Sequence, residues 1–167
     1  MRLLINDPNI LLDLEAGQLL DKLFRMPHRF LVSDILYHEQ LAGHYAHLMK
    51  KGLTPVKLDS SNMVYAHALI RCTRGPSRTD CFALALAKQE HCPLLSNDTG
   101  LQQIARQEAM HSMDTLWLVE QMIEQRLINA QQANTAYELM KTKGRPLPWD
   151  KASQRLDALR VKMVGAA

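Results

Sequence analysis

Four acidic residues are placed where a folded chain could use them together for metal chemistry: Asp7, Glu39, Asp80 and Asp98. Asp7 and Asp98 each come shortly after a short apolar segment that is typical of a buried strand. Asp80 opens a helix-forming segment, and Glu39 lies within another one. Ligands of open parallel sheets bind outside the carboxyl ends of the strands. We therefore expect these four carboxylates to converge at one edge of a sheet.

Four neighbouring carboxylates repel one another, and a divalent cation would offset that repulsion. A ligand set made only of oxygen atoms suits Mg²⁺ or Mn²⁺. A metal held in this way can activate water and stabilise charge on a scissile phosphate. The predicted chemistry is therefore metal-assisted phosphodiester hydrolysis, with either one or two ions.

Each of these acids also has a simpler structural interpretation. Asp7 precedes Pro8, a pair that suits the start of a helix. Asp80 is placed to interact favourably with a helix dipole. The 17 acids among 167 residues will produce some plausible spacings by chance, so the joint pattern carries the prediction. Asp13, near two turns beyond Asp7, is a candidate for supporting the site, whereas Asp34 reads as a helix-start residue.

The elements that must position these acids alternate between strand and helix. The expected strands are short and apolar and cover residues 2–5, 30–32, 54–58, 93–96 and 110–113. The expected helices cover residues 8–14, 18–24, 34–50, 63–72, 80–87, 101–109, 115–124, 130–143 and 150–161. Ser60 or Ser61 is the expected cap of the fourth helix, and Ser77 that of the fifth. This alternation predicts an α/β fold with a mainly parallel central sheet and helices on both faces.

Composition and charge narrow the class of protein. The chain is 47% hydrophobic and 22% charged, as in ordinary soluble domains. It lacks the roughly 18 uninterrupted apolar residues of a membrane span, and its N-terminus does not read as a signal peptide. The three cysteines favour buried free thiols in the cytoplasm. A net charge of +3 is compatible with a polyanionic partner without identifying one.

Four sequence motifs in order resemble those of the PIN-domain family. They are Asp7-Pro8-Asn9, Glu39-Gln40-Leu41, Asp80 with the helix-forming residues 81–87, and the apolar segment 94–95 followed by Ser96-Asn97-Asp98. The resemblance covers about residues 3–122. It implies a three-layer PIN-like domain, which we place at residues 1–143. Residues 144–167 are longer than the same stretch in small members of the family, and their sequence predicts a loop and a short helix packed on the same domain.

By this resemblance Asp7, Glu39, Asp80 and Asp98 are the catalytic metal ligands. Asn9 would orient a carboxylate or a water molecule. Many relatives have Thr-Asp-Asp or Thr-Gly-Asp in the fourth motif, whereas this chain has Ser96 to supply the hydroxyl and Asn97 as a neutral ligand.

The implied function is that of a Mg²⁺- or Mn²⁺-dependent endoribonuclease, the toxin of a toxin–antitoxin pair. Its expected partners are an RNA substrate and a protein antitoxin, and a homodimer is one assembly that this allows. The alternatives are a housekeeping RNA-processing nuclease and a non-catalytic binding module with the same fold. Basic residues near the acids would position phosphate groups or simply face solvent: Arg71, Arg74, Arg78, Lys88 and Arg106.

Other chemistries find less support in the sequence. His44 and His47 are neighbours on a helix face, but no third ligand completes a zinc motif. A GxSxG elbow and a glycine-rich nucleotide loop are both absent from the sequence. A phosphoacceptor receiver domain would need paired acids after the first strand, where Asn6-Asp7 supplies only one.

Overall fold

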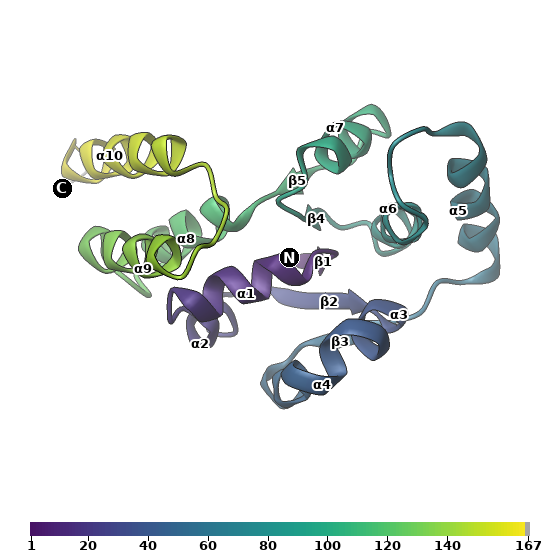
Figure 1. Ribbon diagram of the computed structural model, residues 1–167, viewed down its shortest axis with the longest axis horizontal. Helices are drawn as coiled ribbons and strands as arrows, with labels where there is room; N and C mark the ends of the chain where they lie inside the picture. Colours follow the sequence, from purple (N-terminus) through teal and green to yellow (C-terminus); the bar gives the residue numbers. More distant parts are fainter. Residues whose placement is uncertain (166–167) are drawn as a thin grey trace. The chain divides into compact units, whose positions relative to one another are not determined.

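A parallel five-stranded sheet organises the fold in the computed structural model, which describes residues 1–165 (Figure 1). The strand order is β3-β2-β1-β4-β5, and every neighbouring pair is parallel. The strands are β1 (Arg2–Ile5), β2 (Arg29–Ser33), β3 (Thr54–Val56), β4 (Leu94–Leu95) and β5 (Ser112–Met113). The predicted α/β class is confirmed, with helices flanking the sheet.

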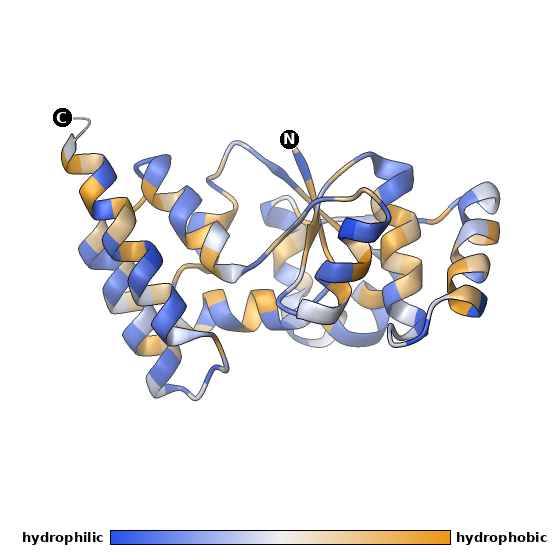
Figure 2. Cartoon of the chain, turned by 90° about the horizontal axis from the view of Figure 1, so that it is seen from above, coloured by the Kyte–Doolittle hydropathy of each residue, from blue (hydrophilic) through white to orange (hydrophobic). Residues whose placement is uncertain are grey.

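Helices connect these strands and complete the chain. They are α1 (Pro8–Ala16), α2 (Leu20–Leu23), α3 (Asp34–Leu36), the π-helix η1 (Tyr37–Leu41), α4 (Ala42–Tyr45), the 3-10 helix η2 (Ala46–Lys51), α5 (Ser60–Cys72), α6 (Arg78–Glu90), α7 (Thr99–Gln107), α8 (Thr115–Glu124), α9 (Ala130–Thr142) and α10 (Trp149–Gly165). Figure 2 shows hydrophobic and hydrophilic residues side by side on these helices, as expected of elements that cover a core.

The chain divides into two compact units. The first contains Met1–Ile10 and Pro27–Asp114, and so holds the entire sheet. The second contains Leu11–Met26 and the chain from Thr115 onward. In the second unit α10 packs against α8 and α9. α10 is therefore part of that unit's helical packing, and it is longer than the short helix expected from the sequence.

The core of the first unit lies where β1 and β4 meet α6. Leu4 and Leu94 are buried in adjacent strands, and α6 contacts both strands. The apolar side of α6 is built from small and medium side chains, Ala83, Leu84 and Ala87 among them. Because these side chains are fully covered, α6 has a fixed register against the sheet. That register also fixes the position of its first turn, which carries Asp80.

Three local predictions were wrong in detail. The single helix expected over residues 34–50 is divided into α3, η1, α4 and η2. The helix after Asp98 begins at Thr99 instead of residue 101, because the Asp98 side chain caps it. Cys72 is exposed, whereas Cys81 and Cys92 are buried as expected.

No helix within residues 1–165 has the length and apolar character needed to cross a membrane.

Candidate metal-binding site

The candidate site lies at the carboxyl ends of β1 and β4, the two central strands at which the strand order reverses. From β1 the chain continues to β2 and β3 on one side of the sheet, whereas from β4 it continues to β5 on the other side. Where the connections of two neighbouring strands leave in opposite directions, a crevice forms outside the strand ends. The Asn6 amide donates a hydrogen bond to the Leu95 carbonyl at 3.2 Å and so ties the two strand ends together. Asp7 follows β1 and Asp98 follows β4 at this edge.

A pocket of about 360 Å³ occupies this edge, and three of the four predicted acids line it: Asp7, Asp80 and Asp98. We call it the acidic pocket. Its other lining residues are Asn6, Pro8, Asn9, Leu36, Gln40, Ser77, Thr79 and Ser96. The predicted supporting residues Asn9 and Ser96 are therefore present, whereas Asn97 is not among the lining residues. The pocket draws together residues of α1, α3, η1 and α6 and residues that directly follow β1 and β4, segments separated by more than half the chain.

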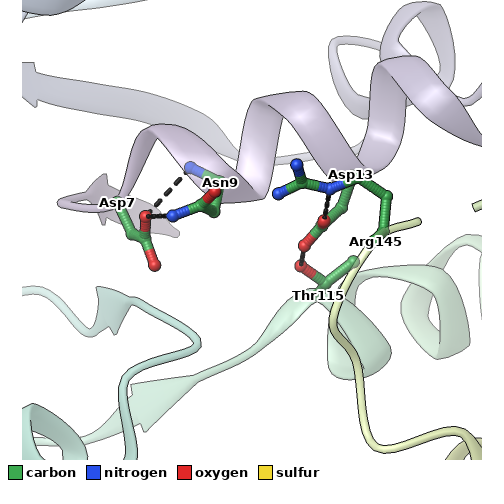
Figure 3. Close-up of polar contacts among 5 residues, drawn as sticks. All are labelled: Asp7, Asn9, Asp13, Thr115 and Arg145. Atoms are coloured by element: carbon green, nitrogen blue, oxygen red, sulfur yellow. Dashed lines mark hydrogen bonds and ion pairs between the residues drawn. The ribbon is translucent and has the colours of Figure 1, made fainter. Parts of the chain in front are cut away.

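Asp7 is held by its neighbour Asn9. Both the backbone N–H and the side-chain amide of Asn9 donate hydrogen bonds to Oδ1 of Asp7, each at 2.9 Å (Figure 3). These bonds fix the carboxylate and leave Oδ2 without a hydrogen-bond partner in the described part of the chain. The helix-start role of Asp7 and a ligand role are therefore compatible, since each uses a different oxygen.

Asp80 is fixed by three hydrogen bonds at the start of α6. The Asp80 N–H donates to Oγ of Ser77 at 3.0 Å, and the Ser77 N–H donates to Oδ2 of Asp80 at 2.9 Å, which together form a capping box. The Asn6 side-chain amide donates to Oδ1 of Asp80 at 3.2 Å. Asp80 therefore has a structural role, as its position in a first turn suggested, and is also held against the end of β1.

Asp98 caps α7 with one oxygen and belongs to an ordered turn. The Leu101 N–H donates to Oδ1 of Asp98 at 2.9 Å. The Asp98 N–H donates to Oγ of the buried Ser96 at 3.1 Å. Oδ2 of Asp98 accepts no hydrogen bond from residues 1–165. The Ser96 hydroxyl thus acts first on the backbone of Asp98.

Glu39 is the predicted acid that the structure does not bring to the acidic pocket. It is exposed on η1, and Gln40 lines the pocket in its place. In an α-helix of about 3.6 residues per turn, positions three and four residues beyond Leu36 would share its face. The i→i+5 bonding of a π-helix widens the turn, so that Glu39 is rotated away from this face while Gln40, four residues beyond Leu36, stays close to it.

Asp13 is engaged elsewhere, in the second unit. Its side chain is buried, Oδ1 accepts a hydrogen bond from Nε of Arg145 at 2.6 Å, and Oδ2 accepts one from Oγ1 of Thr115 at 2.8 Å (Figure 3). Both carboxylate oxygens therefore have protein partners. The role that these contacts assign to Asp13 is the anchoring of the loop that precedes α10.

The acidic pocket presents an open set of oxygen donors. Within residues 1–165, no group of three or more His, Cys, Asp or Glu side chains is close enough to enclose a metal ion. Mg²⁺ is usually bound through one or two carboxylates, several waters and substrate phosphates rather than by an all-protein cage. The free Oδ2 atoms of Asp7 and Asp98, with no nitrogen or sulfur donor lining the pocket from His or Cys, fit that mode of binding.

A second pocket of about 340 Å³ adjoins the acidic one, since Asp80 and Asp98 line both. We call it the Arg74 pocket. Its remaining lining residues are Thr73, Arg74, Gly75, Pro76, Gly100, Leu101, Gln103, Ile104 and Gln107. It therefore combines one cation, two amides and an apolar floor next to the carboxylates. Of the five basic residues singled out in the sequence, only Arg74 lines either of these two pockets.

Sequence reasoning missed Asn6 and Gln40 as parts of the site. Asn6 stands directly after β1 and is only 8% exposed. A buried asparagine at the carboxyl end of a central strand was a usable signal, because a buried amide needs hydrogen-bond partners. Gln40 lies four residues after Leu36 and would share its face in any regular helix, but nothing in the sequence marked that face as bordering the site.

The chain matches one protein-family model and is similar to solved structures of other proteins. A family model described as DUF3368, a PIN domain, matches residues 3–160. A PilT N-terminus domain protein from the archaeon Sulfolobus solfataricus P2 is similar over 71% of this chain and 90% of its own, with 10% identity and a TM-score of 0.45. VapBC2 from Rickettsia felis, solved with a DNA fragment from its promoter, is similar over 68% of this chain and 98% of its own, with 14% identity and a TM-score of 0.46. No curated protein matches the chain.

Proposed function

The chain belongs to the PIN-domain family, and on that premise we propose that it is a divalent-metal-dependent endoribonuclease whose active site is the acidic pocket. The observation that carries the proposal is the convergence of Asp7, Asp80 and Asp98 on one pocket at the point where the strand order reverses. Chance spacing of acids along a sequence does not predict such convergence at the edge where α/β proteins bind ligands.

In this proposal the carboxylates of Asp7 and Asp98 hold Mg²⁺ or Mn²⁺ through their unpaired oxygens. The bound metal would lower the pKa of a water molecule and neutralise charge on the scissile phosphate. Asp80 is fixed at both oxygens by Ser77 and Asn6, so its carboxylate would add negative charge beside the cation without moving. Asn9 and Ser96 orient Asp7 and the backbone of Asp98. The role of Glu39 as a metal ligand stays a prediction from the sequence.

RNA is the proposed substrate because Arg74, a cation without a partner among the described residues, lines the Arg74 pocket, which shares Asp80 and Asp98 with the acidic pocket. Arg74 makes no hydrogen bond or ion pair within the described residues, whereas Arg78 lies over the ring of Phe82 at 5.6 Å and Lys88 over that of Tyr65 at 3.8 Å. A free guanidinium beside a metal site can hold a phosphate through paired hydrogen bonds. The carboxylates also disfavour the alternative of a non-catalytic module, which would have no use for them.

A toxin of a toxin–antitoxin pair, acting in the cytoplasm against an antitoxin protein, is the biological setting that we propose. Such a protein would co-purify with its antitoxin when both are expressed from their natural locus. A housekeeping RNA-processing enzyme would purify without such a partner. Both settings require the same chemistry at the acidic pocket.

The test is incubation of the purified protein with mixed cellular RNA. Cleavage is expected with Mn²⁺ or Mg²⁺ and is expected to cease when EDTA is added. The Asp7→Asn protein, checked for folding by circular dichroism, is the matched control and should be inactive. Cleavage that continues in EDTA, or equal cleavage by the two proteins, would remove the acidic pocket as the active site.

A further inference from the structure

The Arg74 pocket has a composition that the metal chemistry does not explain. Hydrolysis at the acidic pocket needs carboxylates and a phosphate-binding cation, but it has no need for the apolar floor formed by Leu101 and Ile104 or for the two glutamines. A pocket that combines an apolar floor with a few polar groups is the usual form of a site for an organic ligand. A ligand in this pocket would lie against Asp80 and Asp98, the acids that it shares with the acidic pocket.

Gln103 and Gln107 present unengaged amides on one face of α7. They are four residues apart, so their side chains are neighbours on the helix surface. Neither side chain has a hydrogen-bond partner within residues 1–165, and both residues are exposed. Gln102 is different, since its amide donates to the Ser96 carbonyl at 2.6 Å and so supports the turn before Asp98. The helix thus uses one glutamine for structure and leaves two facing the pocket.

We propose that the Arg74 pocket binds an unpaired nucleobase next to the scissile phosphate, with Gln103 and Gln107 reading its edge and adenine preferred. The proposal rests on the nuclease function and names the substrate as single-stranded RNA. Proteins read RNA sequence mainly through unpaired bases, whose edges are free for hydrogen bonds. A glutamine amide offers a donor and an acceptor side by side, which match N7 and the N6 amino group of adenine.

The arrangement of the lining assigns a part of the nucleotide to each group. The apolar side chains of Leu101 and Ile104 would contact the base ring, and the guanidinium of Arg74 would contact a phosphate. The scissile phosphate would then lie toward the acids that line both pockets. Arg74 would add affinity for every RNA, whereas the glutamines would discriminate among bases.

The test separates RNA binding from cleavage by using the Asp7→Asn protein in Mg²⁺. Fluorescence anisotropy measures its Kd for labelled ten-nucleotide RNAs made only of adenylate or only of uridylate. We expect the adenylate RNA to bind roughly tenfold more tightly, the discrimination typical of one amide–base pair. Adding Gln103→Ala and Gln107→Ala should bring the ratio of the two Kd values close to one. Gln131→Ala, an exposed glutamine of α9, is the control and should leave the ratio unchanged.

The outcomes for this subsite and for the nuclease are distinguishable. If the ratio is the same with and without the two glutamines, or if no RNA binds, the base subsite is rejected even where the wild-type protein cleaves RNA. If the ratio falls on removal of the glutamines, the subsite stands even where no RNA cleavage is detected. Equal binding of the two RNAs by the starting protein would also overturn the proposal.

Discussion

Asn6 and Asp80, 74 positions apart in the sequence, are joined by a hydrogen bond of 3.2 Å from the Asn6 amide to Oδ1 of Asp80. The bond connects the end of β1 to the first turn of α6. It lies beside the acidic pocket, which both residues line. Because the backbone of Asn6 also bonds to Leu95 at the end of β4, this one residue relates three of the elements that carry the acids.

Loss of the Asn6 amide should weaken metal binding without abolishing folding. We expect Asn6→Ala to raise the Mn²⁺ concentration needed for half-maximal RNA cleavage by roughly 10- to 100-fold, the usual effect of removing a group that orients a ligand. The measurement is a Mn²⁺ titration of the cleavage rate. Asn62→Ala is the matched control, because its amide makes a similar bond to Asp59 outside both pockets. An equal Mn²⁺ requirement in wild type and folded Asn6→Ala would contradict this role.

Metal should stabilise the folded protein through the acidic pocket. A ligand that binds only the folded state adds about 2.7 kcal/mol to the free energy of unfolding at one hundred times its Kd. We expect Mn²⁺ to raise the Tm of the wild type more than that of Asp80→Asn, measured by differential scanning fluorimetry. Asp59→Asn also removes a helix-capping aspartate, but outside the pocket, and should respond as the wild type does. The same shift in all three proteins would argue against a metal near Asp80.

The ion pair between Asp13 and Arg145 should be a main support of the second unit. Asp13 is 1% exposed and Arg145 19% exposed, with 2.6 Å between Oδ1 and Nε. Removing one partner of a buried pair leaves the other charge buried without a partner, which typically lowers the free energy of unfolding by about 3–5 kcal/mol. We therefore expect Arg145→Met to lower the free energy of unfolding in urea by about that much.

The control for this prediction is Arg160→Met, which removes a more exposed arginine lying 3.9 Å from Asp157. Exposed pairs contribute about 0–1 kcal/mol, so this change should be nearly neutral. Similar losses from the two substitutions would show that burial of Asp13 is not what makes Arg145 important.

The three thiols should differ sharply in reactivity. Burial is the main cause that raises the pKa of Cys92 to about 11, and burial followed by the charge of Asp80 raises the pKa of Cys81. Since the thiolate is the reactive form, both should stay protonated at pH 8, and both are also shielded. Iodoacetamide should therefore modify the exposed Cys72 first, as followed by mass spectrometry of peptides. Alkylation of Cys92 in the folded protein at the rate seen in urea would be inconsistent with this structure.

The positions of Asp7 and Asp98 could be predicted because each acid comes shortly after a segment whose apolar residues mark it as a buried strand. Both follow apolar strands, and the carboxyl ends of neighbouring parallel strands meet at one edge of a sheet. Asp80 could be placed because Ser77 three residues earlier is a recognisable helix cap. At these positions the local sequence and the fold favour the same structure.

The positions of Glu39 and Asp13 could not be predicted from spacing. The sequence motif places Glu39 in a regular helix over residues 34–50, but one π-helical turn rotates its side chain away from the pocket. Asp13 has partners about one hundred and more positions away along the chain, at Thr115 and Arg145, that no local pattern reveals. Both placements depend on contacts that only tertiary packing determines.

The most direct test of the metal site compares single and double replacements of Asp7 and Asp98. RNA cleavage at fixed Mn²⁺ is measured for the wild type, Asp7→Asn, Asp98→Asn, the double variant and Glu39→Gln, each confirmed as folded. If the two aspartates hold one metal, each single replacement should remove most of the rate, and the double variant should be little worse, because residues that act as a unit are not additive. Glu39→Gln should be milder, since Glu39 does not line the pocket. Full activity in folded Asp7→Asn or Asp98→Asn would contradict the proposed active site.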